Sequence, residues 1–364
     1  MSMEMTDLPT ERSQRVRDRR IEQVVELIAP AQILDDLPLS AGQEDAVLRH
    51  RREVAGILDR SDDRLLVVVG PCSVHDVDAA LEYAQRLSAR ASELRDELCI
   101  AMRVYFEKPR TTIGWKGLIN DPHLDGSGDV NSGLRLARQL LREVLDLGLP
   151  IGCEFLDPIT PQYISDLVAW GAIGARTTES QIHRQLASGL SMPVGFKNRT
   201  DGNVKVAVDA VRAAASRHAF AGIDVSGAPA ILHTQGNQDC HIILRGGRAA
   251  PNYGPDPVAG ALTQLQDAGL PQRLVIDASH DNSGKDHDRQ PGVVTEIADQ
   301  IAAGNGALVG VMLESFLLGG RQDLEPGTPV VYGQSITDAC MDWETTILAL
   351  DRLAAAARSR RDSG

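Results

Sequence analysis

The stretch LLVVVG, residues 65–70, sets the expected fold class of this 364-residue chain. It carries neither the polar alternation of a half-buried strand nor the period of an amphipathic helix. Continuous runs of Val, Ile and Leu are typical of strands that are buried on both faces, as in parallel sheets covered by helices. We therefore expect this stretch to form an interior strand of an α/β protein.

Seven further apolar runs follow along the chain, and amphipathic patterns such as those at 131–147 and 338–354 lie between them. Eight strand and helix units predict a (β/α)8 TIM barrel over residues 63–364. A doubly wound open sheet is the alternative. The seven runs are CIAMRVYF (99–106), LPIGCEF (149–155), AIGAR (172–176), MPVGFK (192–197), CHIILRGG (240–247), RLVIDAS (273–279) and ALVGVMLES (307–315).

Two segments fall outside these units. Residues 1–62 form an N-terminal helical extension with helical patterns at 19–29 and 41–58, and residues 219–234 read as an inserted β-hairpin that turns at Ser226-Gly227. Because neither segment is needed to close a barrel, we expect both to serve oligomer contacts or regulation.

The composition excludes several classes of protein. A formal net charge of −13 argues against nucleic acid and anionic membranes as partners, since both require a broad basic face. The chain lacks an apolar run long enough for a membrane span and a signal-peptide start, so we expect a cytoplasmic protein. Its five cysteines form no CxxC pair, which indicates free thiols.

Reactive side chains stand at the end of every predicted strand, where barrel enzymes place their active sites. A single charged strand end is common, but charged or metal-binding residues at all eight indicate a site. The basic members predict ligands with more than one anionic group, although pairing with local acids is an alternative. They are Arg103, Lys108, Arg110, Arg176, Lys197 and Arg245.

A second set has the chemistry of metal ligands: Cys72, His280, Glu314 and Asp338. A thiolate, an imidazole and two carboxylates suit one divalent Mn, Fe, Co or Zn ion better than Mg or Ca. Each residue also has an ordinary structural explanation, namely a buried thiol, a turn histidine, a strand-end acid or an acid in the first turn of a helix. Their shared position at one rim of the barrel favours the metal site.

The motifs resemble those of the class I 3-deoxy-D-arabino-heptulosonate 7-phosphate (DAHP) synthases, in the branch inhibited by single aromatic amino acids. The resemblance covers nearly the whole chain in order, through strings such as GPCSVHD (70–76), FEKPRTT (106–112), IGARTTESQ (173–181), VIDASHDNSGKD (275–286) and YGQSITDACMDWE (332–344). It implies a (β/α)8 enzyme that joins phosphoenolpyruvate to erythrose 4-phosphate, releases phosphate and opens the shikimate pathway.

The resemblance also implies roles for individual residues. Binding of phosphoenolpyruvate is expected from Arg103 and Lys108 at its carboxylate, and from Ala175, Arg176, Lys197 and Arg245 at its phosphate. Arg110 and Thr111 are expected to bind the phosphate of the sugar. The four residues of the metal set occupy the metal-ligand positions, and Lys108 and Glu154 are expected to assist proton transfer beside Cys72 and His280.

An aromatic amino acid effector, with tyrosine favoured, and a homodimer or homotetramer are further implications. The expected effector residues are Phe155, Gln162, Leu190, Ser191 and Phe220, with Asp18 from a neighbouring subunit. Arg199 departs from the glycine of the family motif. The loop end IGWKGLINDPHLD (113–125) is expected to pack around the mouth of the site or against a neighbouring subunit.

Two alternatives remain at this point. One is a related phosphoenolpyruvate-dependent synthase that uses a longer sugar phosphate, arabinose 5-phosphate. The other is a catalytically weak regulatory subunit that binds aromatic amino acids. The intact set of metal and phosphate residues argues against the second alternative.

Overall fold

The predicted barrel is confirmed by the computed structural model, which describes residues 17–110, 114–324 and 329–363. Within these residues, eight parallel strands close in the order β1-β10-β9-β8-β5-β4-β3-β2, so the doubly wound alternative is wrong. Each predicted apolar run overlaps one strand. The strands are β1 Leu65–Gly70, β2 Leu98–Arg103, β3 Ile151–Glu154, β4 Trp170–Ile173, β5 Val194–Lys197, β8 His241–Leu244, β9 Leu274–Asp277 and β10 Leu308–Glu314.

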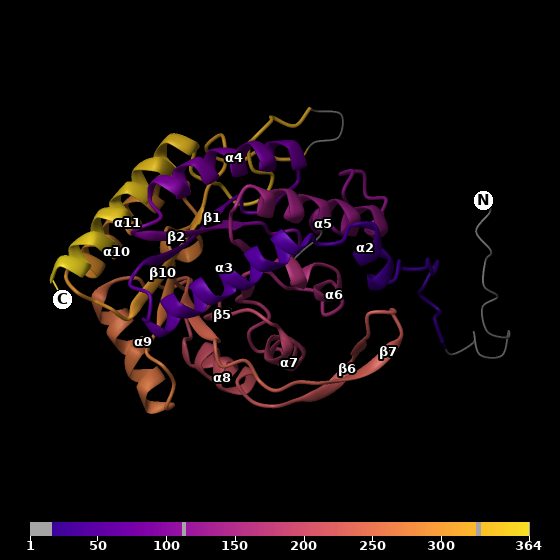
Figure 1. Cartoon of the computed structure of the whole chain (residues 1–364), viewed down its shortest axis with the longest axis horizontal. Helices are drawn as coiled ribbons and strands as arrows, with labels where there is room; N and C mark the ends of the chain where they lie inside the picture. Colours follow the sequence, from indigo (N-terminus) through magenta and orange to yellow (C-terminus); the bar gives the residue numbers. More distant parts are fainter. Residues whose placement is uncertain (1–16, 111–113, 325–328, 364) are drawn as a thin grey trace.

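Helices surround the barrel (Figure 1). None of those in the described part of the chain is long and apolar enough to cross a membrane. The barrel helices are α4 Val77–Glu93, α5 Val130–Asp146, α6 Pro161–Ile164, α7 Gln181–Gly189, α8 Lys205–Ala214, α9 Pro255–Asp267, α10 Gln290–Ala302 and α11 Trp343–Ser363. Short 3-10 turns occupy Ser165–Leu167, His280–Asn282 and His287–Arg289.

The amphipathic pattern at 131–147 became α5, but the pattern at 338–354 was wrong in its first residues, because α11 begins only at Trp343. The reason is a competing set of backbone bonds. Met341 N donates to Glu314 O and Gly320 N donates to Cys340 O, so Cys340 and Met341 form bridge pairs beside the end of β10. Asp338 therefore lies in a bend just before these pairs rather than in a helix.

The N-terminal extension is helical only in part. In its described residues, 17–62, the helices are α2 Pro30–Asp36 and α3 Ala41–Asp59, and the latter begins with a capping box of Ser40 and Gln43. The helix predicted at 19–29 is wrong, since the described residues 21–29 are not helical. Ile21 and Val24 are 55% and 69% exposed. An amphipathic helix gains most of its stability from packing its apolar face, and of this face only Ile28 packs against the core within the described chain.

The inserted hairpin is present and consists of β6 Ala219–Ile223 paired antiparallel with β7 Pro229–His233. It turns at Ser226-Gly227 as predicted, where Gly227 has a φ of 82°. The hairpin projects from the barrel on the same side as α2 (Figure 1), and Ala31 N donates to Val225 O across this side at 2.7 Å. This backbone hydrogen bond links the N-terminal segment to the hairpin of the same chain.

The loop after β2 is anchored by its second half. The side chains of Trp115, Leu118 and Ile119 are buried, and the indole Nε1 of Trp115 donates to Asp121 O at 2.9 Å. Lys108 N donates to Lys116 O at 2.8 Å, which folds the loop back onto the end of β2. The segment therefore packs against the mouth of its own barrel, one of the two arrangements expected from the sequence.

Gly117 makes this close packing possible. Its φ is 114°, and a Cβ there would collide with the carbonyl oxygen of Phe106. We expect Gly117→Ala to lower the free energy of unfolding by more than the roughly 1–2 kcal/mol that a left-handed alanine costs. Gly126→Ala is the matched control, because Gly126 has a φ of 74° and a Cβ added there would meet no atom within 4 Å. Equal losses for the two variants in urea unfolding would contradict this account.

Candidate active site

A single pocket at the carboxyl ends of the strands gathers most of the predicted site residues. The part of the chain that the structure describes lines it with Cys72, Arg103, Lys108, Pro109, Glu154, Gly174, Ala175, Arg176, Thr177, Lys197, Thr200, Arg245, His280, Lys285 and Asp338. Parallel strands converge at this end of a barrel, which explains why residues so far apart in sequence meet. Side chains fill most of the pocket and leave about 50 Å³ free.

The metal-ligand candidates surround one point in this pocket. Donor atoms of Cys72, Glu314 and Asp338 lie within 4.8 Å of one another. The ammonium of Lys108 sits beside them, with Nζ 2.8 Å from Cys72 Sγ and 3.0 Å from Asp338 Oδ2. Because these donor atoms already bind an ammonium group, they can also bind a metal cation. A thiol and two carboxylates fit the divalent metals expected from the sequence.

His280 stands next to this group without being one of its three members. Its Nε2 lies 3.7 Å from Glu314 Oε1, and its Nδ1 lies 2.8 Å from Asp277 Oδ2. A histidine that binds a metal through one ring nitrogen is usually held in place by a carboxylate at its other ring nitrogen. The arrangement is therefore consistent with His280 as the fourth ligand.

The charges at this point stabilise each other. Burial alone would raise the pKa of Asp338, but Lys108 and His280 hold that pKa well below its usual range. Burial likewise opposes ionisation of Glu314, and His280 and Arg103 lower its pKa. Burial raises the pKa of the Cys72 thiol, and the nearby carboxylate of Glu314 raises it further. The thiol thus needs a cation beside it to ionise.

The most buried cation of the site is Arg103. It donates from Nη2 to Glu314 Oε1 and to Cys72 O, both at 2.9 Å. Its Cζ lies 3.6 Å from the centroid of the Tyr105 ring, a cation–π contact. Sequence analysis did not select Tyr105, because its apolar surroundings look like ordinary strand core.

Other basic residues of the pocket also have acidic partners, as the local-pairing alternative anticipated. Lys197 Nζ lies 3.0 Å from Asp277 Oδ2, and Arg245 forms an ion pair with Asp281. These acids stand behind the cations, which still line the pocket. Arg176 donates to Pro109 O at 3.3 Å. Pairing therefore holds the cations in the wall and leaves them facing the cavity.

Glu154 lines the same pocket from the end of β3. A Cβ at position 174 would collide with Glu154 Oε1, so only glycine at this position lets the carboxylate occupy its place. Gly174 is thus a site residue that the sequence reading missed.

The predicted sugar-phosphate residues lie apart from this pocket. Arg110 donates from Nε to Trp115 O at 2.9 Å and lines an adjoining cavity of about 720 Å³ with Lys116 and Asn120. The two cavities share Lys108 and Pro109. Thr111 lies outside the described residues.

The predicted effector residues are spread over several segments. Phe155 is buried directly after β3, Gln162 lies in α6, Leu190 and Ser191 follow α7, and Phe220 lies in β6. Asp18 lies in the exposed N-terminal segment. Their grouping into one effector site stays a prediction.

Arg199, the departure from the family motif, has both of its terminal nitrogens engaged. Nη1 lies 2.6 Å from Glu179 Oε1 and Nη2 lies 3.2 Å from Asp201 Oδ2. Its charge is therefore balanced by neighbouring acids at the surface.

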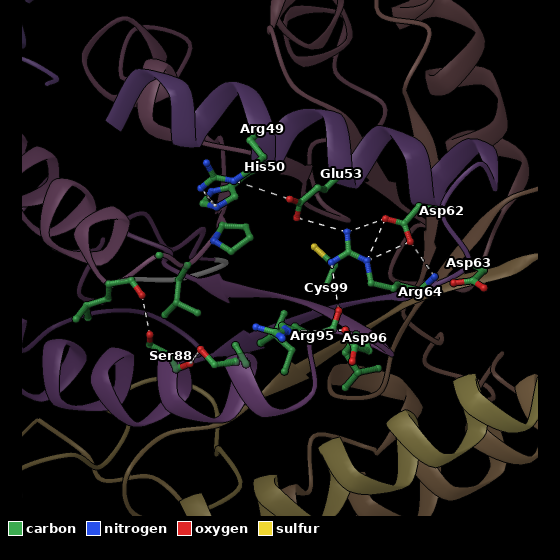
Figure 2. Close-up of a pocket in the computed structure, with 18 of the residues that line it drawn as sticks. Arg49, His50, Glu53, Asp62, Asp63, Arg64, Ser88, Arg95, Asp96 and Cys99 are labelled. Carbon is green, nitrogen blue, oxygen red and sulfur yellow. Dashed lines mark hydrogen bonds and ion pairs between the residues drawn. The ribbon is translucent and has the colours of Figure 1, made fainter. Parts of the chain in front are cut away.

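A larger crevice of about 920 Å³ lies at the opposite end of the barrel, among the amino ends of β1 and β2 and α3 (Figure 2). Its charged groups are paired with one another, as Figure 2 shows for Arg64 with Asp62 and Glu53. In barrels of this class, active sites occupy the carboxyl end and the amino end serves stability. We therefore assign function to the smaller pocket.

The whole chain is similar to one family of known proteins. The profile of the DAHP synthetase I family matches residues 38–351. The Phe-sensitive phospho-2-dehydro-3-deoxyheptonate aldolase of Escherichia coli K12 is 56% identical over 344 residues, which cover 94% of this chain and 98% of that protein. The Tyr-sensitive form from the same strain is 54% identical over 321 residues, 88% of this chain and 90% of that protein.

A solved structure is also similar. The structure of phospho-2-dehydro-3-deoxyheptonate aldolase from Francisella tularensis SCHU S4 superimposes with a TM-score of 0.92. It is 50% identical in sequence, and the match covers 94% of this chain and 99% of that one. The likeness in fold therefore extends over nearly the whole chain.

Glu107 joins the two loops that border the site. Its carboxylate accepts from Asp157 N at 3.2 Å and from Thr160 Oγ1 at 3.1 Å, which ties the loop after β2 to the segment after β3. Burial raises the pKa of Glu107 from 4.5 to about 8. Sequence analysis missed this residue because a glutamate between Phe106 and Lys108 reads as a partner for local cations.

The raised pKa of Glu107 predicts a pH dependence of stability. Between pH 4.5 and about 8 the folded protein keeps a proton on Glu107 that the unfolded chain has released, so the free energy of unfolding falls as the pH rises. Glu107→Gln cannot ionise, and we expect its stability to fall less steeply across this window. Parallel curves for the variant and the wild type in urea unfolding at several pH values would contradict the assignment.

Proposed function

The chain belongs to the DAHP synthetase I family, and we propose that it condenses phosphoenolpyruvate with D-erythrose 4-phosphate and water to give DAHP and phosphate. This reaction is the first step of the shikimate pathway, and the membership confirms the resemblance found in the sequence. The observation that carries the proposal is the pocket itself, where basic residues and metal donors share one wall.

Phosphoenolpyruvate carries a carboxylate and a phosphate, and the pocket offers cations for both. We assign the carboxylate to Arg103 and Lys108, beside the metal donors. We assign the phosphate to Arg176, Lys197 and Arg245 with the backbone of Ala175. Arginine in such positions binds phosphate oxygens in pairs, and burial strengthens these bonds.

Erythrose 4-phosphate brings a second phosphate, which we assign to Arg110 and Thr111. The adjoining cavity supports this assignment, since it contains Arg110 and shares Lys108 with the main pocket. Lys108 would then stand where the two substrates meet.

We assign one divalent metal, Mn, Fe, Co or Zn, to Cys72, His280, Glu314 and Asp338. The fit rests on the cluster of three donors around the Lys108 ammonium and on the orientation of His280 by Asp277. When bound, such an ion supplies Lewis-acid polarisation of the aldehyde.

The proton transfers are assigned to side chains of this chain. Carbon 3 of phosphoenolpyruvate bonds to the aldehyde carbon, and the ammonium of Lys108 donates a proton to the oxygen that becomes a hydroxyl. In the structure, burial opposes the charge on Lys108, whereas Cys72 and Asp338 raise its pKa above the usual range. Glu154 accepts a proton from the water that adds to carbon 2. The C–O bond to phosphate then breaks as the new hydroxyl on carbon 2 becomes the ketone of the product, and phosphate leaves with the proton of that hydroxyl.

The subunit contacts are proposed on the exposed apolar surface. Ile21, Val24 and Val25 of the N-terminal segment and Ile231 of the hairpin are exposed in the single chain. Isolated apolar side chains are common at surfaces, but a run of them beside a projecting hairpin suits a homodimer or homotetramer. A mass of one chain in sedimentation equilibrium would contradict this.

The test of the reaction uses metal-stripped protein. We expect phosphate release from phosphoenolpyruvate and erythrose 4-phosphate after Mn²⁺ is added, and none in excess chelator. Cys72→Ser is expected to weaken metal binding by more than the roughly 10–100-fold that loss of an outer-shell partner costs. Cys99→Ser is the matched control, since Cys99 is also a buried thiol but borders the crevice at the opposite end of the barrel. Turnover of arabinose 5-phosphate in place of erythrose 4-phosphate would indicate the related synthase instead, and no turnover of either would favour a regulatory subunit.

The effector proposal has its own test. We expect tyrosine to lower the initial rate, and Phe220→Ala to weaken this inhibition because the side chain lies in the hairpin of the proposed effector site. Leu348→Ala, an exposed leucine on α11, is the control and should leave inhibition intact. Rates that are unchanged by tyrosine but lowered by phenylalanine or tryptophan would overturn the assignment.

A further inference from the structure

Lys285 lines the active-site pocket, yet neither the sequence reading nor the assignment of substrates gives it a role. It has a φ of 63°, the left-handed region that a lysine rarely adopts. Its N donates to His280 O at 2.5 Å and closes a tight turn directly after His280. The position of Lys285 is thus fixed to that of a candidate metal ligand, and backbone strain of this kind collects at functional sites.

A contribution to the stability of the fold does not explain why a lysine occupies position 285. Its Nζ lies 4.0 Å from Asp338 Oδ1, longer than a hydrogen bond, and its side chain is 48% exposed. Ion pairs of this geometry at the surface contribute little to stability. Asp338 already has a closer partner in Lys108, at 3.0 Å from its other oxygen. Lys285 therefore keeps donors free on the rim of the pocket.

Depth separates Lys285 from the other cations of the pocket. Arg103, Lys197 and Arg245 are buried, and they suit the substrate that lies deepest. Under the proposed function that substrate is phosphoenolpyruvate. Erythrose 4-phosphate would then lie above it, between the donor set and the rim, where its hydroxyl and phosphate oxygens can accept from an ammonium group.

We propose that Lys285 is a binding residue for erythrose 4-phosphate, donating from Nζ to oxygen atoms of this substrate and taking no part in binding phosphoenolpyruvate. This inference rests on the proposed function, because it assigns the deep part of the pocket to phosphoenolpyruvate. It adds a specificity determinant to the rim of the pocket, in the segment after β9.

The test compares Lys285→Met and Lys285→Arg with the wild type. Loss of a hydrogen bond from a charged donor is expected to raise KM for erythrose 4-phosphate by about 10–100-fold, with partial recovery in the arginine variant. The Kd for phosphoenolpyruvate, measured by calorimetry on the Mn²⁺ enzyme without the sugar, should stay within about twofold. Lys205→Met is the matched control, since Lys205 pairs with Asp209 on α8 at the surface.

Three results would overturn the inference. The first is an equal loss of affinity for both substrates, and the second is no change in either. The third is tighter Mn²⁺ binding with unchanged KM values, which would make Lys285 only a counter-ion of Asp338. An inactive wild type would instead refute the proposed function, so the two failures are distinguishable.

Discussion

Charges that are buried at the carboxyl end of the barrel must be paired, and the site takes its form from this requirement. Arg103 and Glu314 are only 1% and 2% exposed and lie 2.9 Å apart. Lys197 and Asp277 form a second buried pair. A buried charge without its partner costs several kcal/mol, roughly 3–5 kcal/mol when one partner is removed. Each acid therefore fixes its cation in the wall, and substrates meet groups that are already in place.

The barrel and its loops supply the positions for these pairs. Strand ends bring the charges together, and the loop after β2 is held over them by Gly117 packed on Phe106 and by the hydrogen bonds of Glu107. Lys108, on the same loop, thus reaches the donors of Cys72 and Asp338. Preorganised groups of this kind need little rearrangement when charge develops during a reaction.

The barrel strands and most of the charged site residues could be predicted from the sequence, but residues that act through their spatial neighbours could not. Apolar runs report strands buried on both faces, and residues such as Arg245 and Glu314 follow such runs directly. Residues whose role depends on what they face were missed, among them Tyr105 under Arg103 and Gly174 beside Glu154. The helical patterns at 19–29 and 338–342 did not form helices, because tertiary contacts decide such segments. The first segment has few packing partners, and the second forms backbone hydrogen bonds beside the end of β10.

We propose that the donor set beside Lys108 is a cation site next to the phosphoenolpyruvate pocket. Anomalous scattering from crystals grown with Mn²⁺ and phosphoenolpyruvate locates such an ion. We expect one manganese peak among Cys72, His280, Glu314 and Asp338, with the Lys108 ammonium moved away from the thiolate toward the substrate. A peak elsewhere, or Lys108 still bonded to Cys72 Sγ with phosphoenolpyruvate bound, would contradict it.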